Sequence, residues 1–222
     1  MLIDCGTDAR WALSELGYAQ EDIDDVYISH LHADHVGGLE WLAFSTFYQK
    51  YPKKITLHMN ETLVKPLWEN VLSGGLCSME GKNATLDSYF NISPISSNSS
   101  FVWENIEFQL IQTIHAMAGF VIIPCFGLFF KLNRDQVYFT ADTQFAPHQI
   151  LKFYEAATLI FQDCETSELK SGVHAAFEEL ITLPSDIKRK MWLYHYNPGE
   201  LPDAKEMGFL GFVSKGQTFL LE

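Results

Sequence analysis

The chain has 222 residues, of which 47% are hydrophobic, and its 28 acidic and 15 basic residues give a net charge of −13. A chain of this length and apolar content can bury a full core, so the simplest organisation is a single domain over residues 1–222. The acidic balance argues against a large nucleic acid as a partner, because nucleic-acid binders usually carry a basic footprint. A charge that merely keeps the protein soluble is an equally good interpretation.

Targeting segments are not evident in the sequence. Asp4, Asp8 and Arg10 fall within the first twenty residues and exclude the apolar core of a signal peptide there. The longest apolar stretch, residues 116–130, contains Pro124 and is too short to span a bilayer. We therefore expect a cytoplasmic protein with no membrane partner.

The first half of the chain alternates strand-like and helix-like segments. Thr7 or Asp8 can cap a helix that Gly17 ends, and residues 26–29 resemble a strand. A helix is predicted over Leu39–Phe47, a strand over residues 55–58, and a helix marred by Pro66 over residues 61–72. Residues 72–100 are the least regular part and include a polar run at residues 96–100. A loop that shapes a substrate pocket and a disordered surface excursion are equally good interpretations.

The second half is predicted to run strand, strand, strand, helix, strand, helix, strand. The segments are residues 108–113, 127–132, 136–140, 148–154, 158–162, 175–182 and 191–194. No repeat or linker interrupts them. Such alternation favours an α/β fold in which two β-sheets pack together with helices outside.

The most informative motif is the hexapeptide HLHADH, which contains His30, His32, Asp34 and His35. Imidazole and carboxylate are the ligands that Zn²⁺ and neighbouring transition metals prefer at neutral pH. In an extended chain residues 30 and 32 point the same way, so two nitrogens can converge on one ion. A turn after them brings Asp34 and His35 to a second ion, and the two glycines that follow permit a tight bend. The hexapeptide therefore predicts a metal site.

This motif is the HxHxDH signature of the metallo-β-lactamase superfamily, which the chain resembles over nearly its whole length. The segment LIDCG at residues 2–6 is similar to a strand end of that family whose Asp, here Asp4, stabilises the ligand loop from behind. The resemblance implies three further ligands, each after a short apolar run: His115, Asp142 and His195. It also implies an αββα sandwich of two mixed β-sheets with helices outside.

The resemblance implies two divalent transition-metal ions. Zn²⁺ suits the imidazole-rich set, and Mn²⁺ or Fe also fits mixed oxygen and nitrogen ligation. One ion would be bound by His30, His32 and His115, the other by Asp34, His35 and His195, and Asp142 would bridge them. We expect Asp34 to orient the attacking water as well as to bind metal. Two ions about 3.5–4 Å apart can activate water and neutralise charge at phosphorus.

One departure from the family lies at the N-terminus. Members normally have two or three strands before the LIDCG-like strand, which here follows Met1 directly, so the N-terminal strands are expected to be shortened. A sheet edge left unpaired in this way would need a cover, and a second subunit could supply it. A homodimer is therefore expected.

Within the superfamily, the second half most resembles the tRNase Z-like phosphodiesterase branch. Residues 159–166 are similar to its LLIHEAT strand end, and residues 172–179 to its GHST helix start, which makes His174 a candidate general acid. Only 27 positions separate His115 from Asp142, which leaves no room for a tRNA-gripping arm. The Arg-Tyr pair expected after Pro198 is also absent.

The compact, acidic core that remains is similar to cyclic-nucleotide phosphodiesterases of this branch, including phage-encoded anti-Pycsar enzymes that destroy cyclic-mononucleotide signals. We therefore predict hydrolysis of 3′,5′-cyclic mononucleotides to linear monophosphates, which would evade immune signalling. A tRNase Z-like endoribonuclease and a hydrolase of another small ester, such as a thioesterase, are the alternatives. A non-catalytic binding module would lose ligands, whereas all seven ligand positions are filled.

The remaining histidines and the cysteines are weaker candidates. His58 could line the cleft but is better interpreted as a partly buried histidine at a strand end, and His148 as a solvated residue at a helix start. The four cysteines lie far apart with no CxxC pair, so buried thiols are favoured over disulfides or metal ligands.

Overall fold

The computed structural model describes residues 1–97 and 99–221. The chain forms two compact units, one ending at Ser97 and the other containing the rest. Each unit is built on its own β-sheet, and this mixture of strands and helices confirms the α/β prediction. Every helix in the described part of the chain is too short or too polar to cross a membrane. The assignment of the whole chain to one domain stays a prediction.

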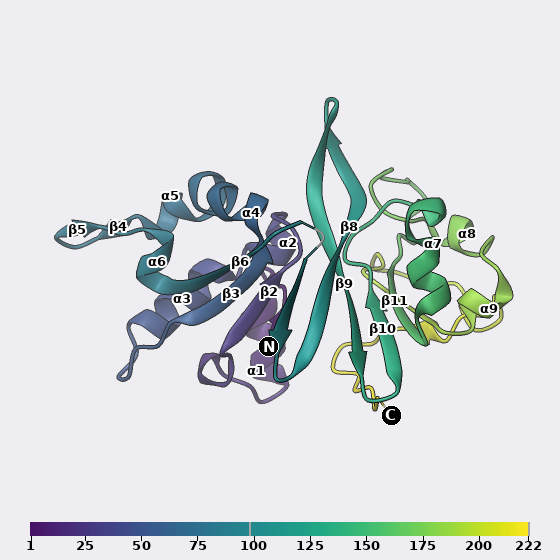
Figure 1. Ribbon diagram of the computed structural model, residues 1–222, viewed down its shortest axis with the longest axis horizontal. Helices are drawn as coiled ribbons and strands as arrows, with labels where there is room; N and C mark the ends of the chain where they lie inside the picture. The colour runs from purple at the N-terminus through teal and green to yellow at the C-terminus, as the bar shows by residue number, and fades with distance from the viewer. Residues whose placement is uncertain (98, 222) are drawn as a thin grey trace. The chain divides into compact units, whose positions relative to one another are not determined.

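The first unit contains a parallel four-stranded sheet in the order β1-β2-β3-β6 (Figure 1). Its strands are β1 Leu2–Ile3, β2 Asp25–Ile28, β3 Ile55–Asn60 and β6 Phe90–Ile95. The helices are α1 Ala9–Glu15, η1 Gln20–Asp22, α2 Ala33–Val36, α3 Leu39–Phe47, α4 Glu61–Pro66, η2 Leu67–Leu72, α5 Ser73–Leu76 and α6 Leu86–Tyr89. A small antiparallel pair, β4 Ser78–Met79 and β5 Lys82–Asn83, lies between α5 and α6. Because β1 and β2 are parallel, the residues that follow them meet at one edge of the sheet.

The sequence predicted α3 to the residue, whereas β6 departs from the expectation of an irregular segment. Phe90 pairs with Ile55 and Pro94 with Met59, so β6 is the edge strand of the sheet. An edge strand tolerates a proline because its outward N–H groups need no partner strand. The polar run at residues 96–100 separates β6 from the next strand, and its central residue, Asn98, lies outside the described residues.

Pro66 divides the predicted helix over residues 61–72 as expected. The α-helix α4 ends there and η2, a π-helix, continues the chain to Leu72. Proline has no N–H to donate, and wide turns of this kind accommodate such a break. At the other predicted helix, Asp8 occupies the N-cap of α1 without a side-chain hydrogen bond, and Gly17 has the left-handed φ of 81° that ends it.

The second unit contains a seven-stranded mixed sheet in the order β13-β12-β11-β10-β9-β8-β7. Its strands are β7 Ser100–Trp103, β8 Ile106–Ala118, β9 Val121–Leu132, β10 Asp135–Phe139, β11 Leu159–Asp163, β12 Met191–Tyr194 and β13 Gly211–Phe212. Strands β7 to β10 are antiparallel, and β10 to β13 are parallel. The parallel strands end at a common edge, where the residues that follow them are brought together.

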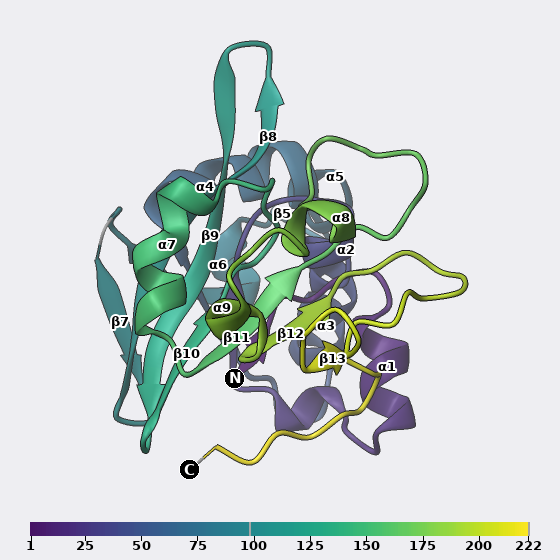
Figure 2. The ribbon, with the colours of Figure 1, turned by 90° about the vertical axis from the view of Figure 1, so that its right-hand side faces the viewer.

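Three helices cover one face of this sheet: α7 Pro147–Ala156, α8 Phe177–Leu180 and α9 Ser185–Lys188 (Figure 2). Their apolar side chains bury a core with the strands in which Tyr138, Ile150, Tyr154, Ile160 and Leu180 are at most 2% exposed. The helix predicted over residues 175–182 is shorter than expected. The resemblance had implied that His174 opens this helix. In the structure His174 lies before the first residue of α8, in the preceding loop.

Candidate metal centre

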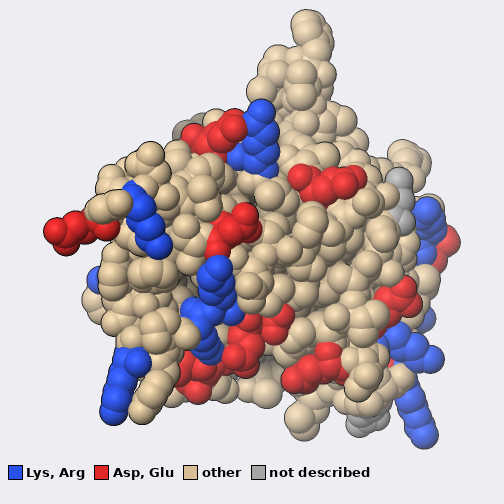
Figure 3. Space-filling view, turned by 60° about the vertical axis from the view of Figure 1, so that its left-hand side comes forward, with Lys and Arg blue, Asp and Glu red and all other residues tan. Residues whose placement is uncertain are grey.

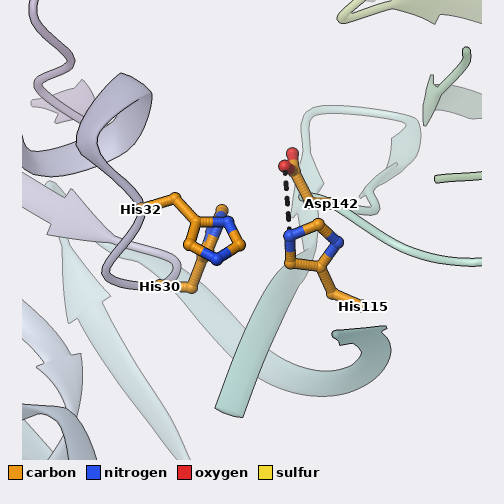
Figure 4. A group of neighbouring side chains, drawn as sticks. All are labelled: His30, His32, His115 and Asp142. Atoms are coloured by element: carbon orange, nitrogen blue, oxygen red, sulfur yellow. Dashed lines mark hydrogen bonds and ion pairs between the residues drawn. The ribbon is translucent and has the colours of Figure 1, made fainter. Parts of the chain in front are cut away.

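In the first unit, the hexapeptide HLHADH follows β2 and supplies four of the predicted ligands. The Nε2 atom of His30 lies 3.1 Å from Nδ1 of His32, and the two rings meet edge to face (Figure 4). Two residues further on, Nε2 of His35 lies 3.5 Å from a carboxylate oxygen of Asp34. The side chains of His30 and His35 are buried, whereas Asp34 is exposed. The hexapeptide thus presents two pairs of donor atoms.

Asp4, at the end of β1, supports this segment from behind. Its carboxylate accepts hydrogen bonds from the backbone N–H of Ser29 at 2.8 Å, the Ser29 hydroxyl at 2.7 Å and Nδ1 of His35 at 2.8 Å. An ionised carboxylate has no proton to donate, so Nδ1 of His35 carries the proton of this hydrogen bond. Nε2 then carries the lone pair that can bind a metal. The contact that the resemblance implied for Asp4 is therefore present.

Glycines allow the backbone of the two segments to touch. A Cβ on Gly6 would lie 1.9 Å from the backbone oxygen of Asp34, and one on Gly38 would lie 2.3 Å from the oxygen of Gly6. Backbone hydrogen bonds from Cys5 to His35 at 2.7 Å and from Gly38 to Cys5 at 2.8 Å fasten this contact. The ligand segment therefore rests directly on the chain that follows β1.

Cys5 lies within this contact, but its thiol is inert. Burial, with a further contribution from the Asp4 charge, raises the pKa of Cys5 to about 12, so the thiol stays protonated at neutral pH. A metal ligand or nucleophile must be a thiolate. All four cysteines are free thiols and Cys5, Cys125 and Cys164 are buried, in agreement with the sequence-based interpretation.

In the second unit, three histidines surround the buried carboxylate of Asp142, which follows β10. One of its oxygens lies 3.7 Å from Nε2 of His115 (Figure 4). The same oxygen lies 3.8 Å from Nε2 of His195 and 3.8 Å from Nδ1 of His174. Asp142 is only 1% exposed, so its charge needs compensation that imidazolium or a metal ion can provide. The second unit therefore brings together the four sequence-predicted residues that it contains.

The position of His115 depends on an irregularity in β8. The register with β9 shifts between Ile114 and Ala116, which is a β-bulge, and bulges re-aim side chains near functional sites. The Nδ1 atom of His115 lies 2.8 Å from the backbone oxygen of Val173. A carbonyl oxygen only accepts, so Nδ1 carries the proton and Nε2 carries the lone pair that faces Asp142.

Asp163, the last residue of β11, is a site residue that the sequence analysis did not single out. It is fully buried, and its carboxylate lies 2.8 Å from Nδ1 of His174 and 3.3 Å from Nδ1 of His195. It also accepts a hydrogen bond of 2.8 Å from the backbone N–H of Thr143, next to Asp142. One carboxylate thus orients two histidines and the turn that follows β10.

The environment of His174 sets its proton affinity. Burial lowers the pKa of His174, but the hydrogen bond and charge of Asp163, together with the charge of Asp142, outweigh burial and raise this pKa above its ordinary value. With Nδ1 donating to Asp163, Nε2 is the ring atom that can hand a proton to a substrate. This arrangement fits a general acid.

The separations between donor atoms fit metal coordination. Metal–nitrogen bonds of about 2.0–2.1 Å at tetrahedral angles place two donors about 3.3 Å apart. The pairs within each unit, from 3.1 Å for His30 and His32 to 3.8 Å for His195 and Asp142, scatter around this value. In the second unit, donor atoms of Asp142, Asp163, His174 and His195 all lie within 4.8 Å of one another. The assignment of all seven ligands to shared ions stays a prediction.

The two weaker histidine candidates have other roles. His58 is buried and lies 2.7 Å from a carboxylate oxygen of Asp25 on the neighbouring strand β2. Because β3 continues to Asn60, His58 lies inside the strand and not at its end, where the sequence had predicted it. His148 is exposed in the first turn of α7.

Comparison with known proteins identifies the family. The family model described as Anti-Pycsar protein Apyc1 matches residues 1–219. The chain belongs to this family. A curated member from Paenibacillus harenae is 38% identical over 198 residues, which cover 88% of this chain and 78% of the relative. The predicted resemblance to anti-Pycsar enzymes is therefore confirmed.

Solved structures confirm the metallo-β-lactamase fold of this Apyc1 family member. YhfI from Bacillus subtilis, a protein of that fold, matches with a TM-score of 0.69 at 18% identity and covers 97% of this chain and 85% of its own. The short form of human tRNase Z matches with a TM-score of 0.60 at 16% identity, covering 87% and 80%. Family, fold and the clustered His and Asp side chains together confirm the predicted enzyme class, a metal-dependent hydrolase.

Proposed function

We propose that this member of the Apyc1 family is a dinuclear metal-dependent phosphodiesterase that opens 3′,5′-cyclic mononucleotides to linear monophosphates. The observation that carries the proposal is the grouping of His115, His174 and His195 around the buried carboxylate of Asp142. The Nε2 atoms of His115 and His195 and the carboxylate of Asp142 are ligands that divalent transition metals prefer. His174, which is hydrogen-bonded to Asp163, can act as a general acid.

The proposed ligand set is the one that the family resemblance implies. His30, His32 and His115 would bind one ion, Asp34, His35 and His195 the other, and Asp142 would bridge them. When bound, two such ions would lower the pKa of water and neutralise the charge that develops at phosphorus. Zn²⁺ is the proposed metal because imidazole ligands predominate, and Mn²⁺ or Fe would fit the same donors.

The residues themselves divide the remaining work. Asp4 and the Val173 carbonyl fix the protonated Nδ1 atoms of His35 and His115, so that Nε2 of each ring is available as a ligand. The carboxylate of Asp34, exposed at the start of α2, would orient the attacking water. Nε2 of His174 would donate a proton to the departing ribose oxygen, which is a poor leaving group without one.

The chain between His115 and Asp142, all of which the structure describes, bears on the size of the substrate. The end of β8, strand β9 and strand β10 account for most of the residues there, so the segment forms the β8–β9 hairpin and has no further arm to grip tRNA. On the face drawn in Figure 3, Lys and Arg side chains are interleaved with Asp and Glu and form no continuous basic patch. Both features favour a small phosphodiester over a nucleic acid.

A hydrolysis screen with metal-loaded protein tests the proposal. Cyclic mononucleotides should be opened to linear monophosphates, and the generic ester bis(p-nitrophenyl) phosphate should also be cleaved. Cyclic dinucleotides and precursor tRNA serve as competing substrates in the same screen. Efficient trimming of precursor tRNA with cyclic mononucleotides untouched would overturn the proposal in favour of a tRNase Z-like role.

We also propose that the protein acts as a homodimer in the cytoplasm, where it would remove cyclic-nucleotide immune signals. Helix α1 has no buried residue, and Trp11 and Tyr18 are 57% and 56% exposed on and after it. Exposed aromatic side chains favour a protein interface. Light scattering coupled to size-exclusion chromatography tests this, and a monomer mass at micromolar concentration would refute the dimer.

A further inference from the structure

The loop between β11 and α8, residues 166–174, controls two side chains of the site. The Val173 oxygen accepts the Nδ1 proton of His115 at 2.8 Å, and the next residue is His174 itself, hydrogen-bonded to Asp163 at 2.8 Å. A shift of this loop therefore moves the proposed general acid and releases the partner that fixes the tautomer of a proposed metal ligand. Errors of about 1 Å in such positions can cost 10²-fold in rate.

The side chain of Asn197 fastens the start of this loop. Its Oδ1 atom accepts hydrogen bonds from the backbone N–H groups of Thr166 and Ser167, both at 2.9 Å. The contact is reciprocal, because the backbone N–H of Asn197 donates to the Thr166 hydroxyl at 3.1 Å. Asn197 lies only two residues after His195, so these three bonds tie the loop to the end of β12.

Glu165 fastens the far side of the loop. Both of its carboxylate oxygens lie 3.0 Å from the backbone nitrogen of Ser171, and the side chain is buried. Its backbone also pairs with the chain after the loop, with bonds of 2.8 Å to the oxygen of Ala175 and 3.0 Å from the nitrogen of Phe177.

The middle of the loop has little packing to hold it. Leu169 is 87% exposed, Glu168, Lys170 and Ser171 are also exposed, and Gly172 has a left-handed φ of 75°. Few buried contacts mean low local stability, so the position of such a segment depends on its anchors. An ion pair of 2.8 Å joins Lys170 to Glu178, but it is exposed to solvent, where such pairs contribute little. The anchors that hold the loop backbone are Asn197 at one end and Glu165 at the other.

We propose that Asn197 and Glu165 are positioning residues that hold the 166–174 loop so that His174 and His115 are oriented together. The inference deepens the proposed phosphodiesterase function and rests on it for the role of His174. Neither residue contacts the substrate in this proposal; both act through the loop. Loosening the loop should therefore impair proton donation first, and metal retention through His115 second.

The experiment compares Asn197→Ala with Asn197→Asp, which keeps the acceptor oxygen, and uses Asn91→Ala as the control. Asn91 is exposed on β6 in the other unit, where its side-chain amide donates a hydrogen bond of 3.4 Å to the backbone oxygen of Lys54. Rates are measured on a cyclic mononucleotide, whose alkoxide leaving group needs a proton, and on bis(p-nitrophenyl) phosphate, whose leaving group does not. Metal retention against a chelator and amide hydrogen exchange of residues 166–173 are measured on the same samples.

We expect Asn197→Ala to slow the cyclic mononucleotide about 10-fold or more and the nitrophenyl ester about 3-fold or less, since general acid catalysis contributes roughly 10²–10⁴-fold. Asn197→Asp and Asn91→Ala should stay near the parental rates. Combined with His174→Ala, the Asn197→Ala change should slow the cyclic substrate no further. Metal affinity should fall about 10-fold, as for other residues that orient ligands, and exchange in the loop should accelerate.

Equal slowing of both substrates, or no slowing, would overturn the positioning role. If the parental protein hydrolyses no phosphodiester at all, the proposed function fails, and the loop is then judged by exchange and metal retention alone. Unchanged exchange and unchanged metal retention in Asn197→Ala would refute the anchor itself.

Discussion

Replacing Asp163 with Asn tests the arrangement of the second unit most directly. The change keeps the shape of the side chain but removes the negative charge that lies 2.8 Å from Nδ1 of His174. The same carboxylate oxygen also accepts from the backbone N–H of Thr143, so the amide oxygen of asparagine takes its place and the hydrogen bond to His174 becomes a neutral one. The imidazolium form of His174 then loses the charge that stabilises it. Asp163→Asn should therefore make His174 a weaker general acid, because a smaller fraction of the imidazole carries the proton that it donates.

The magnitude follows from the charge that is lost. A hydrogen bond to a charged group contributes about 1.5–3 kcal/mol and one between neutral groups about 0.5–1.5 kcal/mol, and each 1.4 kcal/mol corresponds to about a factor of ten. Replacing the charged Asp163–His174 bond by a neutral one should therefore lower the rate on a cyclic mononucleotide by about 5- to 12-fold. The pKa of His174, raised by Asp163, should fall. Activity that needs protonated His174 is lost as pH rises through this pKa, so the alkaline limb of the pH–rate profile should move to lower pH.

The assay is a set of pH–rate profiles of kcat/KM for the parental protein, Asp163→Asn and a control. Asp135→Asn is a matched control, since Asp135 begins the neighbouring strand β10 and accepts a 2.9 Å hydrogen bond from Thr158 at the opposite end from the site. Circular dichroism and metal content confirm that each variant is folded and loaded. A profile of Asp163→Asn that keeps the parental rate and shape would refute the reasoning.

Three further predictions concern the metals, the acid and the packing. Asp142→Ala should abolish activity and lower bound metal in elemental analysis while the fold persists by circular dichroism; full metal content with parental activity would contradict the bridging role. His174→Ala should keep its metal but slow cyclic mononucleotides by about 10²-fold or more, with a smaller loss on bis(p-nitrophenyl) phosphate; loss of metal would show that His174 is a ligand. Gly6→Ala should lower the free energy of unfolding by about 3 kcal/mol, because the Cβ would meet the Asp34 oxygen at 1.9 Å. Gly74→Ala, with nothing within 4 Å of its Cβ, should change it by less than about 1 kcal/mol in urea titrations.

Segments whose local pattern and packing agree were predictable from the sequence. Helix α3 and strand β12 have the bounds that their apolar residues predict, and the hexapeptide HLHADH lies directly after β2 as expected. Strand β6 was missed because Asn91 and Pro94 have low strand propensity, and its pairing with β3 supplies what the local sequence lacks. Tertiary pairing overrides propensity most easily in such short edge strands.

Asp163 was missed for a different reason. It lies within residues 159–166, which resemble the LLIHEAT strand end, but no spacing marks this residue, and its role arises only when β10, β11 and β12 align in parallel. That alignment brings the residues after the three strands to one edge, where Asp142, Asp163 and His195 meet. A linear sequence contains the three residues but not the strand order, and the strand order makes them one site.

The backbone conformation shows where this assembly carries strain. Six residues other than glycine have positive φ among those described, and three of them, Glu104, Asn105 and Asn133, occupy turns between antiparallel strands. Such turns favour positive φ. The other three are Asp4, Ala141 and His195, with φ of 59°, 52° and 62°, and each lies one or two residues after a strand that has a parallel neighbour.

Left-handed conformations cost an L-residue about 1–2 kcal/mol each, and a chain selected for stability alone would place glycine at these positions. Glycine would not serve at two of them, because the side chain of Asp4 accepts the hydrogen bond from His35 and the side chain of His195 lies beside the Asp142 carboxylate. Ala141 turns the chain so that Asp142, the next residue, faces the histidines. The strain therefore concentrates at the ends of β1, β10 and β12, because each sharp turn there must also place a side chain of the site. Strain of this kind persists only where surrounding contacts determine the conformation.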